Sequence, residues 1–120
     1  MSTPRNLDDR DLLPVIESRD KPMLIAFQAG WCPPCRALTP NLEALAYEAG
    51  DRVSIVRVDI DQAPLAAQAF GIRTVPTLVL FDPEKSLGAR IGWQSLAQLR
   101  AWVEPVTRTV LQHQTAIAHG

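Results

Sequence analysis

Residues 27–36 read Phe27-Gln28-Ala29-Gly30-Trp31-Cys32-Pro33-Pro34-Cys35-Arg36, and this stretch decides both the fold and the chemistry that the sequence predicts. It ends the continuous apolar run of residues 23–27, typical of a buried strand, and precedes apolar residues at helical spacing. Its two cysteines are the only ones in the chain. A Cys-x-x-Cys pair at a strand-to-helix junction indicates a dithiol–disulfide redox site.

The two cysteines of this motif are predicted to have unequal roles. We expect Cys32 at the N-cap of the following helix and Pro33 at its first position, where a missing N–H costs nothing. Pro34 removes a further donor, so the backbone N–H of Cys35 is the nearest partner for the Cys32 sulfur. The helix dipole and this hydrogen bond both favour a thiolate at Cys32. Cys32 is therefore predicted to be the exposed, attacking sulfur, and Cys35, one turn on and more buried, the resolving sulfur.

A metal site is the main alternative for a cysteine pair. Zinc takes four ligands, and the chain offers no third cysteine. Its two histidines, His113 and His119, lie in the terminal segment, six residues apart and outside the usual ligand spacing. A zinc site would require two copies of the chain to pool their motifs. The sequence therefore favours redox chemistry over metal binding or an inert pair.

Composition and charge set the broader limits. With 120 residues, the chain is expected to form one domain over residues 1–120. A net charge of −1 gives no reason to expect nucleic acid or an anionic membrane as a partner, and no run of about 18 apolar residues predicts a membrane span. The N-terminal residues lack the apolar core of a secretory signal and are acidic by Asp8, which predicts a cytoplasmic protein. In the cytoplasm a lone cysteine pair is more often catalytic than structural.

Hydrophobic periodicity and capping residues predict the order of the elements along the chain. Residues 1–6 are expected to be a loose, polar lead-in, and Pro40 and Pro105 to kink or end the helices in which they fall. In chain order we expect a helix over about 9–18 capped by Asp8 or Asp9, a strand over 23–27, a helix from the cysteine motif to Gly50, a strand over 53–59, a helix over 64–70 with Asp61 as candidate cap, strands over 75–81 and 87–91, and a helix starting at Ser95.

This order predicts an α/β fold with a mixed sheet. The first two helical crossovers imply parallel strand pairing, and the late pair of strands implies an antiparallel hairpin. Strands alternating with helices in this way give a central sheet covered by helices on both faces.

At this point the chain resembles the thioredoxin family. The resemblance rests on residues 31–36, Trp-Cys-Pro-Pro-Cys-Arg, with the strand before them, and on Thr74-Val75-Pro76-Thr77 about forty residues later. Residues 58–61, residues 71–73 and Gly92 match the family pattern in order and spacing. The resemblance covers about residues 8–104 and implies the thioredoxin fold. It leaves residues 105–120 as a C-terminal extension, expected to be helical and to pack on the domain through the apolar residues Val106, Val110, Leu111 and Ile117.

The resemblance also implies a substrate-binding site. Pro76 resembles the cis-proline that faces the active-site sulfurs in this family, where the backbone of Val75 would pair with an extended segment of a substrate. An X–Pro bond adopts the cis form at a cost of only about 0.5–1 kcal/mol. The docking surface for a partner protein would consist of Trp31, Pro34, Val75, Pro76, Ile91, Gly92 and Trp93, with Trp93 equally suited to a place in the core.

One departure from the family pattern concerns the proton of the resolving thiol. The family usually has an acidic residue on the strand before the motif and a lysine on the neighbouring strand. This chain has Ala26 and Arg57 at those positions. The thiol of Cys35 must therefore lose its proton to water or to another carboxylate, and Asp59 and Asp61 are the candidates.

Two further departures lie in the motif stretch itself. Pro33 stands where the family usually has glycine, which stiffens the motif and is expected to change its reduction potential. Gln28 stands where the family commonly has tryptophan and is expected to leave the site less shielded.

The function implied by motif and resemblance is thiol–disulfide exchange. The protein would reduce protein disulfides as a monomeric enzyme of electron transport and cell redox homeostasis, with no cofactor besides the Cys32–Cys35 disulfide. A flavin-dependent, thioredoxin-reductase-like enzyme or a second dithiol protein would recycle it. Two alternatives remain open from the sequence: a binding module or chaperone that uses the Val75-Pro76 surface with weak turnover, and a net oxidase or isomerase.

Overall fold

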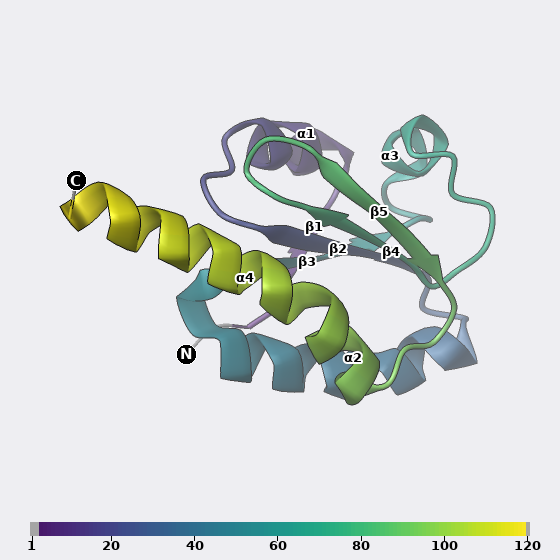
Figure 1. Ribbon diagram of the computed structural model, residues 1–120. Helices are drawn as coiled ribbons and strands as arrows, with labels where there is room; N and C mark the ends of the chain where they lie inside the picture. The colour runs from purple at the N-terminus through teal and green to yellow at the C-terminus, as the bar shows by residue number, and fades with distance from the viewer. Residues whose placement is uncertain (1–2, 120) are drawn as a thin grey trace.

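The computed structural model describes residues 3–119 of the chain, with side chains as far as residue 108. Its centre is one five-stranded sheet with the spatial order β1-β3-β2-β4-β5 (Figure 1). The strands are β1 Arg5–Leu7, β2 Met23–Gln28, β3 Ser54–Asp59, β4 Thr77–Phe81 and β5 Ser86–Ile91. The pairs β1·β3 and β2·β3 are parallel, whereas β2·β4 and β4·β5 are antiparallel, so the predicted mixed sheet is confirmed.

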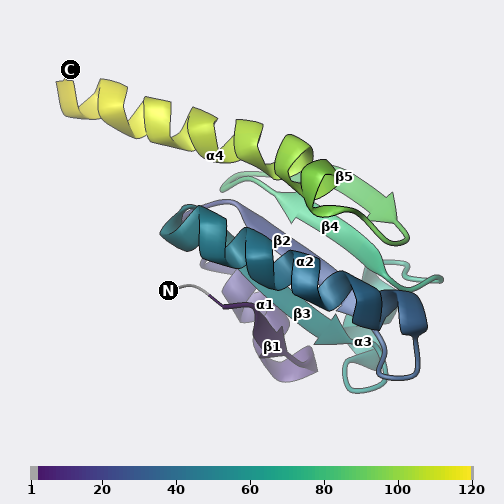
Figure 2. The ribbon, with the colours of Figure 1, turned by 90° about the horizontal axis from the view of Figure 1, so that it is seen from below.

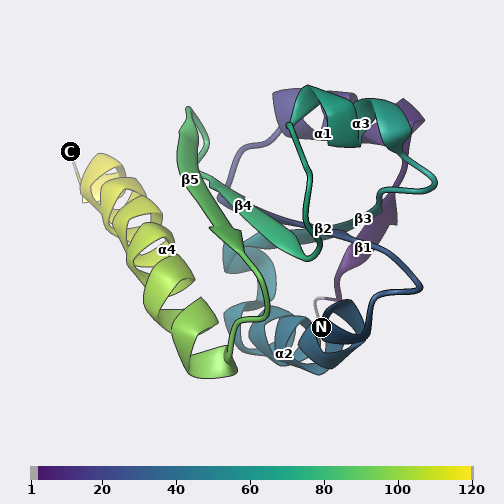
Figure 3. The same cartoon turned by 90° about the vertical axis from the view of Figure 1, so that its right-hand side faces the viewer.

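Helices cover both faces of this sheet, as predicted. Figure 3 shows the two layers: α1 and α3 lie on one side, and α2 and α4 lie on the other. In Figure 2, α2 runs across β2 and β3. The helices are α1 Asp9–Glu17, α2 Pro33–Ala49, α3 Pro64–Ala69 and α4 Leu96–His119, with a short 3₁₀ turn at Gly50–Arg52. No helix of the described chain combines the length and apolar character that crossing a bilayer requires.

The central strand β2 divides the core into two halves. Alternate side chains of a strand point to opposite faces. Leu24 and Ala26 accordingly pack under α2 and α4, whereas Ile25 and Phe27 pack under α1 and α3. All four are fully buried, because helices cover the strand on both sides.

The N-terminal segment differs from its prediction. Instead of a loose lead-in, Arg5–Leu7 forms β1 and pairs in parallel with residues 56–58 of β3. Leu7 packs against the core half under α1 and α3, and the ladder satisfies backbone groups at the edge of β3. Three residues with one apolar side chain carry no periodicity, so the sequence contains no strand signal here.

The direction of β4 also corrects the prediction. The second crossover, from β3 through α3, was expected to give parallel strands, but β4 runs antiparallel to β2. The six residues of α3 rise only about 9 Å, whereas the six residues of β3 span about 20 Å. The helix is therefore too short to carry the chain back to the end of the sheet where β3 begins. As a result β4 begins beside the C-terminal end of β2, which brings Val75 and Pro76 next to the cysteine motif.

Helix caps agree with the sequence at α1 and differ at α3. Asp8 caps α1, with its carboxylate accepting the N–H groups of Arg10 (3.0 Å) and Asp11 (3.3 Å). The prediction that Asp61 caps α3 is wrong. The carboxylate of Asp9, in α1, caps α3 across the interface between the two helices. It accepts the backbone N–H of Leu65 at 3.1 Å and of Ala66 at 2.7 Å.

The two helical prolines end neither helix. Pro40 lies within the unbroken helix α2, which ends as predicted at Gly50, a residue with a φ of 57°. Pro105 lies within α4. Past Pro105, Val106 packs on the core under α2 and α4, and Thr107 is only 3% exposed, so tertiary contacts hold the helix beyond the proline. Val110, Leu111 and Ile117 lie outside the residues whose side chains are described.

Candidate active site

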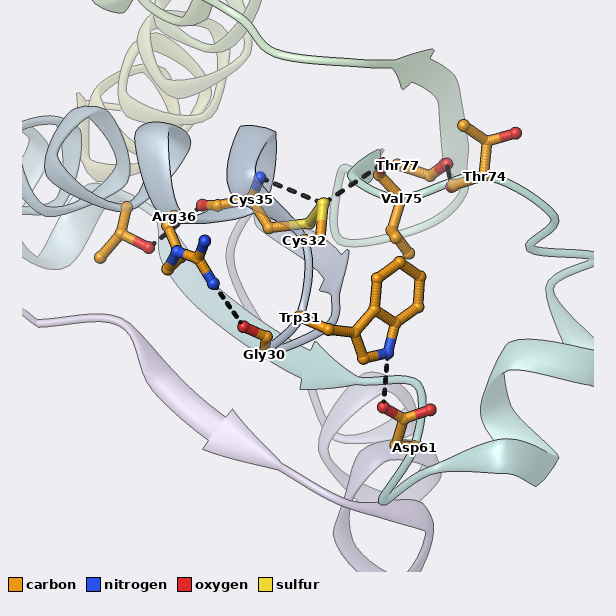
Figure 4. The surroundings of a disulfide bond; sticks show 10 residues. Gly30, Trp31, Cys32, Cys35, Arg36, Asp61, Thr74, Val75 and Thr77 are labelled. Carbon is orange, nitrogen blue, oxygen red and sulfur yellow. Dashed lines mark hydrogen bonds between the residues drawn. A yellow bond between two sulfur atoms is a disulfide. The ribbon is translucent and has the colours of Figure 1, made fainter.

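The cysteine motif joins the end of β2 to the start of α2, as predicted. Cys32 is the N-cap residue, with φ −99° and ψ 110°, and prolines occupy the first two helical positions. The backbone N–H of Cys35 donates to the Sγ of Cys32 at 3.3 Å (Figure 4). Because the prolines supply no N–H, this is the donor that the helix start offers to the sulfur.

Cys32 and Cys35 form a disulfide, with their Cα atoms 5.3 Å apart. Cys32 is 4% exposed and Cys35 is 2% exposed, so the expected exposed position of Cys32 is not found in this oxidised form. The pair packs with Ala29, Ile60 and Val75 in a small cluster at the edge of the sheet. These neighbours cover the disulfide, and a partner must approach closely to reach the sulfur of Cys32.

A cis peptide bond between Val75 and Pro76 faces the disulfide, as the resemblance implies. The Sγ of Cys32 lies 3.6 Å from the carbonyl oxygen of Val75, a contact that a reduced thiol can use as a hydrogen bond (Figure 4). Gly92 secures the loop from the other side, because its N–H donates to the carbonyl of Pro76 at 2.8 Å. The geometry therefore gathers both cysteines, Val75, Pro76 and Gly92 at one place.

Large apolar side chains surround this place. Trp31 is 64% exposed, Ile91 69% and Trp93 48%, so Trp93 lies at the surface and not in the core. Pro34 is also exposed. The rim that the sequence predicts is thus present as an apolar surface.

Hydrogen bonds that the sequence analysis missed fix this rim. The indole N–H of Trp31 donates to the carboxylate of Asp61 at 2.9 Å, and that of Trp93 to the carbonyl of Ala37 at 3.4 Å. Arg36 donates to the carbonyl of Gly30 at 2.9 Å and braces the loop before the motif. Figure 4 shows the Trp31 and Arg36 contacts on the same loop. No sequence pattern could have identified the partners of Trp31 and Trp93, because the fold brings them together from separate segments.

The region beneath the motif lacks a carboxylate at position 26. Ala26 is fully buried and lies opposite Arg57 in the β2·β3 register. Arg57 donates to the side chain of Asn6 at 3.2 Å, at the β1 edge. The side chains described here contain no group of three or more His, Cys, Asp or Glu residues placed to hold a metal ion. The side chains of His113 and His119 lie outside that part of the chain.

A disulfide at a helix N-terminus, opposite a cis-proline on a mixed sheet, defines a thiol–disulfide oxidoreductase. Comparison with known proteins specifies the family. The family model described as Thioredoxin matches residues 5–105. Thioredoxin from Alicyclobacillus acidocaldarius subsp. acidocaldarius is 39% identical over 87 residues, which cover 72% of this chain and 83% of that protein. Thioredoxin from Acidithiobacillus ferridurans is 38% identical over 97 residues, which cover 81% of this chain and 89% of that protein.

Solved structures agree with this match. The structure of chloroplastic thioredoxin z superposes with a TM-score of 0.81 at 28% identity, covering 88% of this chain and 96% of that one. The chain belongs to the thioredoxin family, and it has the thioredoxin fold. Its activity is that of a protein-disulfide reductase.

Proposed function

We propose that this reductase activity operates through Cys32 as the attacking thiolate and Cys35 as the resolving thiol. The observation that supports these roles is the N-cap geometry, in which the N–H of Cys35 donates to the Sγ of Cys32 at 3.3 Å. This donor and the helix dipole stabilise negative charge on Cys32 and not on Cys35. The Cys32 thiolate attacks a substrate disulfide to give a mixed disulfide, and Cys35 then displaces the substrate.

In this proposal the substrate binds as an extended segment along the cis-proline loop. The carbonyl of Val75, 3.6 Å from the Cys32 sulfur, is in position to accept a backbone N–H of such a segment. The exposed apolar rim would cover the segment on both sides and exclude water from the exchanging sulfurs. The binding residues proposed are Trp31, Pro34, Val75, Pro76, Gly92 and Trp93.

The remaining parts of the proposal concern the setting of the reaction. Electrons come from a thioredoxin-reductase-like enzyme or from another dithiol protein, because the chemistry needs a donor for the Cys32–Cys35 disulfide. We place the protein in the cytoplasm as a monomer that needs no cofactor, membrane or nucleic acid. Residues 1–120 form one thioredoxin-like domain, with about 8–104 as its core and 105–120 as its extension.

Trapping of the mixed disulfide tests the two cysteine roles. A Cys35→Ser variant should accumulate covalent complexes with substrate proteins that dithiothreitol releases, and a Cys32→Ser variant should accumulate none. Reduction of insulin disulfides should be lost in both variants. If Cys32→Ser retains full insulin reduction, the assignment of the attacking sulfur is wrong.

A further inference from the structure

Cys35 borders a cavity on the α2 side of the sheet. The cavity has a volume of about 110 Å³ and lies between the first turns of α2 and the ends of β2 and β3. Besides Cys35, its polar lining includes Gln28, Thr39 and Asp59. Gln28 and Asp59 also line a second, outer cavity of about 350 Å³ toward α1, where Asp8 and Asp11 lie. These two residues thus separate the surroundings of Cys35 from the outer cavity.

The strand register places Gln28 and Asp59 on the face that carries the cysteine helix. They are paired in the β2·β3 ladder, two positions beyond the pair of Ala26 and Arg57. Side chains two positions apart on a strand share a face, and Ala26 packs under α2. Where the family usually has an acid, this chain therefore has a methyl group, and the next pair on this face, Gln28 and Asp59, supplies the polar groups.

Gln28 has an unsatisfied polar atom at this place. Among the described side chains, its Oε1 is the buried polar atom that accepts no hydrogen bond. A buried acceptor of this kind calls for a partner. The inner cavity, the one of about 110 Å³ beside Cys35, is large enough for a water molecule. A buried water needs a cavity volume of roughly 10–15 Å³ and two or more polar partners. Gln28, the hydroxyl of Thr39 and the carboxylate of Asp59 supply these partners.

The structure also separates the two candidate carboxylates. Asp61 accepts the indole N–H of Trp31 on the rim and does not line the cavity beside Cys35. Asp59 lines that cavity, and its Oδ1 accepts the N–H of Asp61 at 2.9 Å, which orients the carboxylate. The charged groups around Asp59 are Arg36 from α2 in the inner cavity, and Asp8 and Asp11 across the outer one.

We propose that Asp59 accepts the proton of the Cys35 thiol through a water molecule that Gln28 and Thr39 hold in the inner cavity. This inference rests on the proposed roles of the two cysteines. As the sulfur of Cys35 attacks that of Cys32, the Cys35 S–H bond breaks and the Cys32–Cys35 bond forms. The bond from Cys32 to the substrate sulfur breaks, and its electron pair leaves on the substrate thiolate.

The proton and the electrons balance within this step. The water takes the thiol proton and passes one to the Asp59 carboxylate, which returns it to solvent through the outer cavity. Over the two exchanges together, the two cysteines are oxidised to the disulfide, the substrate disulfide is reduced by two electrons, and no further reagent is required. Gln28 is a positioning residue in this step, because it acts through the water.

Single-turnover kinetics with a chromogenic aromatic disulfide separate the two exchanges. The first thiolate is released when Cys32 attacks and the second when Cys35 resolves. The Asp59→Asn variant should slow the second release roughly tenfold to hundredfold at pH 7 and leave the first within about twofold. Its second release should then rise about tenfold per pH unit below the thiol pKa, as unassisted ionisation requires. Gln28→Leu should slow the same release. Asp61→Asn should leave it within about twofold, because the asparagine oxygen can still accept the indole N–H of Trp31.

A rescue variant and a cysteine control complete the test. Adding Ala26→Asp to Asp59→Asn supplies a carboxylate on the same face and should restore the second release. An unchanged second release in Asp59→Asn, or an equal loss of both releases, would overturn the role of Asp59. Release of both thiolates by Cys32→Ser at the wild-type rate would instead overturn the proposed function itself. Thermal unfolding of each variant identifies any that fail to fold, and Gln28→Leu then stands in for the double variant.

Discussion

At the scale of single residues, Gly92 combines an unusual backbone with a contact to the cis-proline loop. Its φ is 95°, a backbone conformation that residues other than glycine rarely adopt, and its N–H donates to the carbonyl of Pro76 at 2.8 Å. No atom beyond Gly92 itself and its two chain neighbours lies within 4 Å of a Cβ built at this position, so the restriction comes from the backbone and not from crowding. Gly92 therefore fixes how β5 meets the loop opposite Cys32.

The Gly92→Ala variant should lose both stability and activity. We expect a loss in the free energy of unfolding on the order of 1–3 kcal/mol, because alanine is strained at this φ, and a several-fold lower kcat/KM for protein disulfides. Gly30→Ala is the matched control, since a Cβ there also meets open space and no positive φ restricts it. Chemical denaturation and insulin reduction measure the two effects, and equal behaviour of both variants would contradict the backbone explanation.

At the scale of elements, the short helix α3 depends on a side chain of α1. The carboxylate of Asp9 accepts two backbone N–H groups at the start of α3, and the N-cap residue Ala63 provides no such bond. A six-residue helix is marginal by itself. The contact therefore holds α3 against α1 and supports the chain that leads to the cis-proline.

Removal of this cap should destabilise the protein by about 1 kcal/mol in Asp9→Ala. Asp11→Ala is the control, because both residues lie in the first turn of α1 and contribute alike to its dipole. Hydrogen exchange should also show faster exchange of the Leu65 and Ala66 amides in Asp9→Ala alone. Equal loss of stability in both variants would show that the charge at α1, and not the cap, was responsible.

An ion pair joins α2 and α4. Arg100 donates from Nε to Oε2 of Glu48 at 2.8 Å and from a second nitrogen to the other oxygen. This side-chain hydrogen bond lowers the pKa of Glu48 below its ordinary value of 4.5. A carboxyl whose pKa is lower in the folded state adds stability above its unfolded pKa, and this stability is lost as pH falls through the folded pKa.

The pH dependence of Arg100→Gln follows from this sign. The variant should melt slightly below the wild type at pH 7, and the difference should shrink as the pH falls below 4.5, the ordinary pKa of Glu48, and vanish once the carboxyl is protonated in the folded state. Both groups are exposed, so the effect should be small and should shrink in high salt. Arg108→Gln on the same helix is the control. A difference that persists in acid would mean that Arg100 acts through packing of its side chain.

The elements also show what the sequence could and could not predict. The cysteine motif, the central strands and the helices were predictable because their periodicity is local, but the cap of α3 was not, because Asp9 provides it from α1. The strand β1 was not, since Arg5–Leu7 gains its partners only from β3. The antiparallel direction of β4 depends on the length of α3, and the cavity behind Cys35 depends on the register of Gln28 with Asp59. These features arise between segments, where sequence periodicity carries no information.

At the scale of the whole molecule, the core extends slightly beyond the part that resembles the family. The family model ends at residue 105, but Val106 packs on the core under α2 and α4, and Thr107 is 3% exposed. The hydroxyl of Thr107 donates to the carbonyl of Glu104 at 2.9 Å, one helical turn earlier. Residues 106–107 therefore belong to the packed domain, although the sequence places them in the extension.

Two truncations separate this packing from the rest of the extension. A chain ending at Arg108 keeps Val106 and Thr107, whereas a chain ending at Glu104 loses both. We expect the shorter chain to be less stable than the longer one by about 1–2 kcal/mol, the value of the apolar surface that Val106 and Thr107 bury. Insulin reduction at 25 °C should be equal in the two, because neither truncation reaches the cysteine motif or the cis-proline. Denaturant unfolding measures the difference, and equal midpoints would show that the domain ends before residue 105.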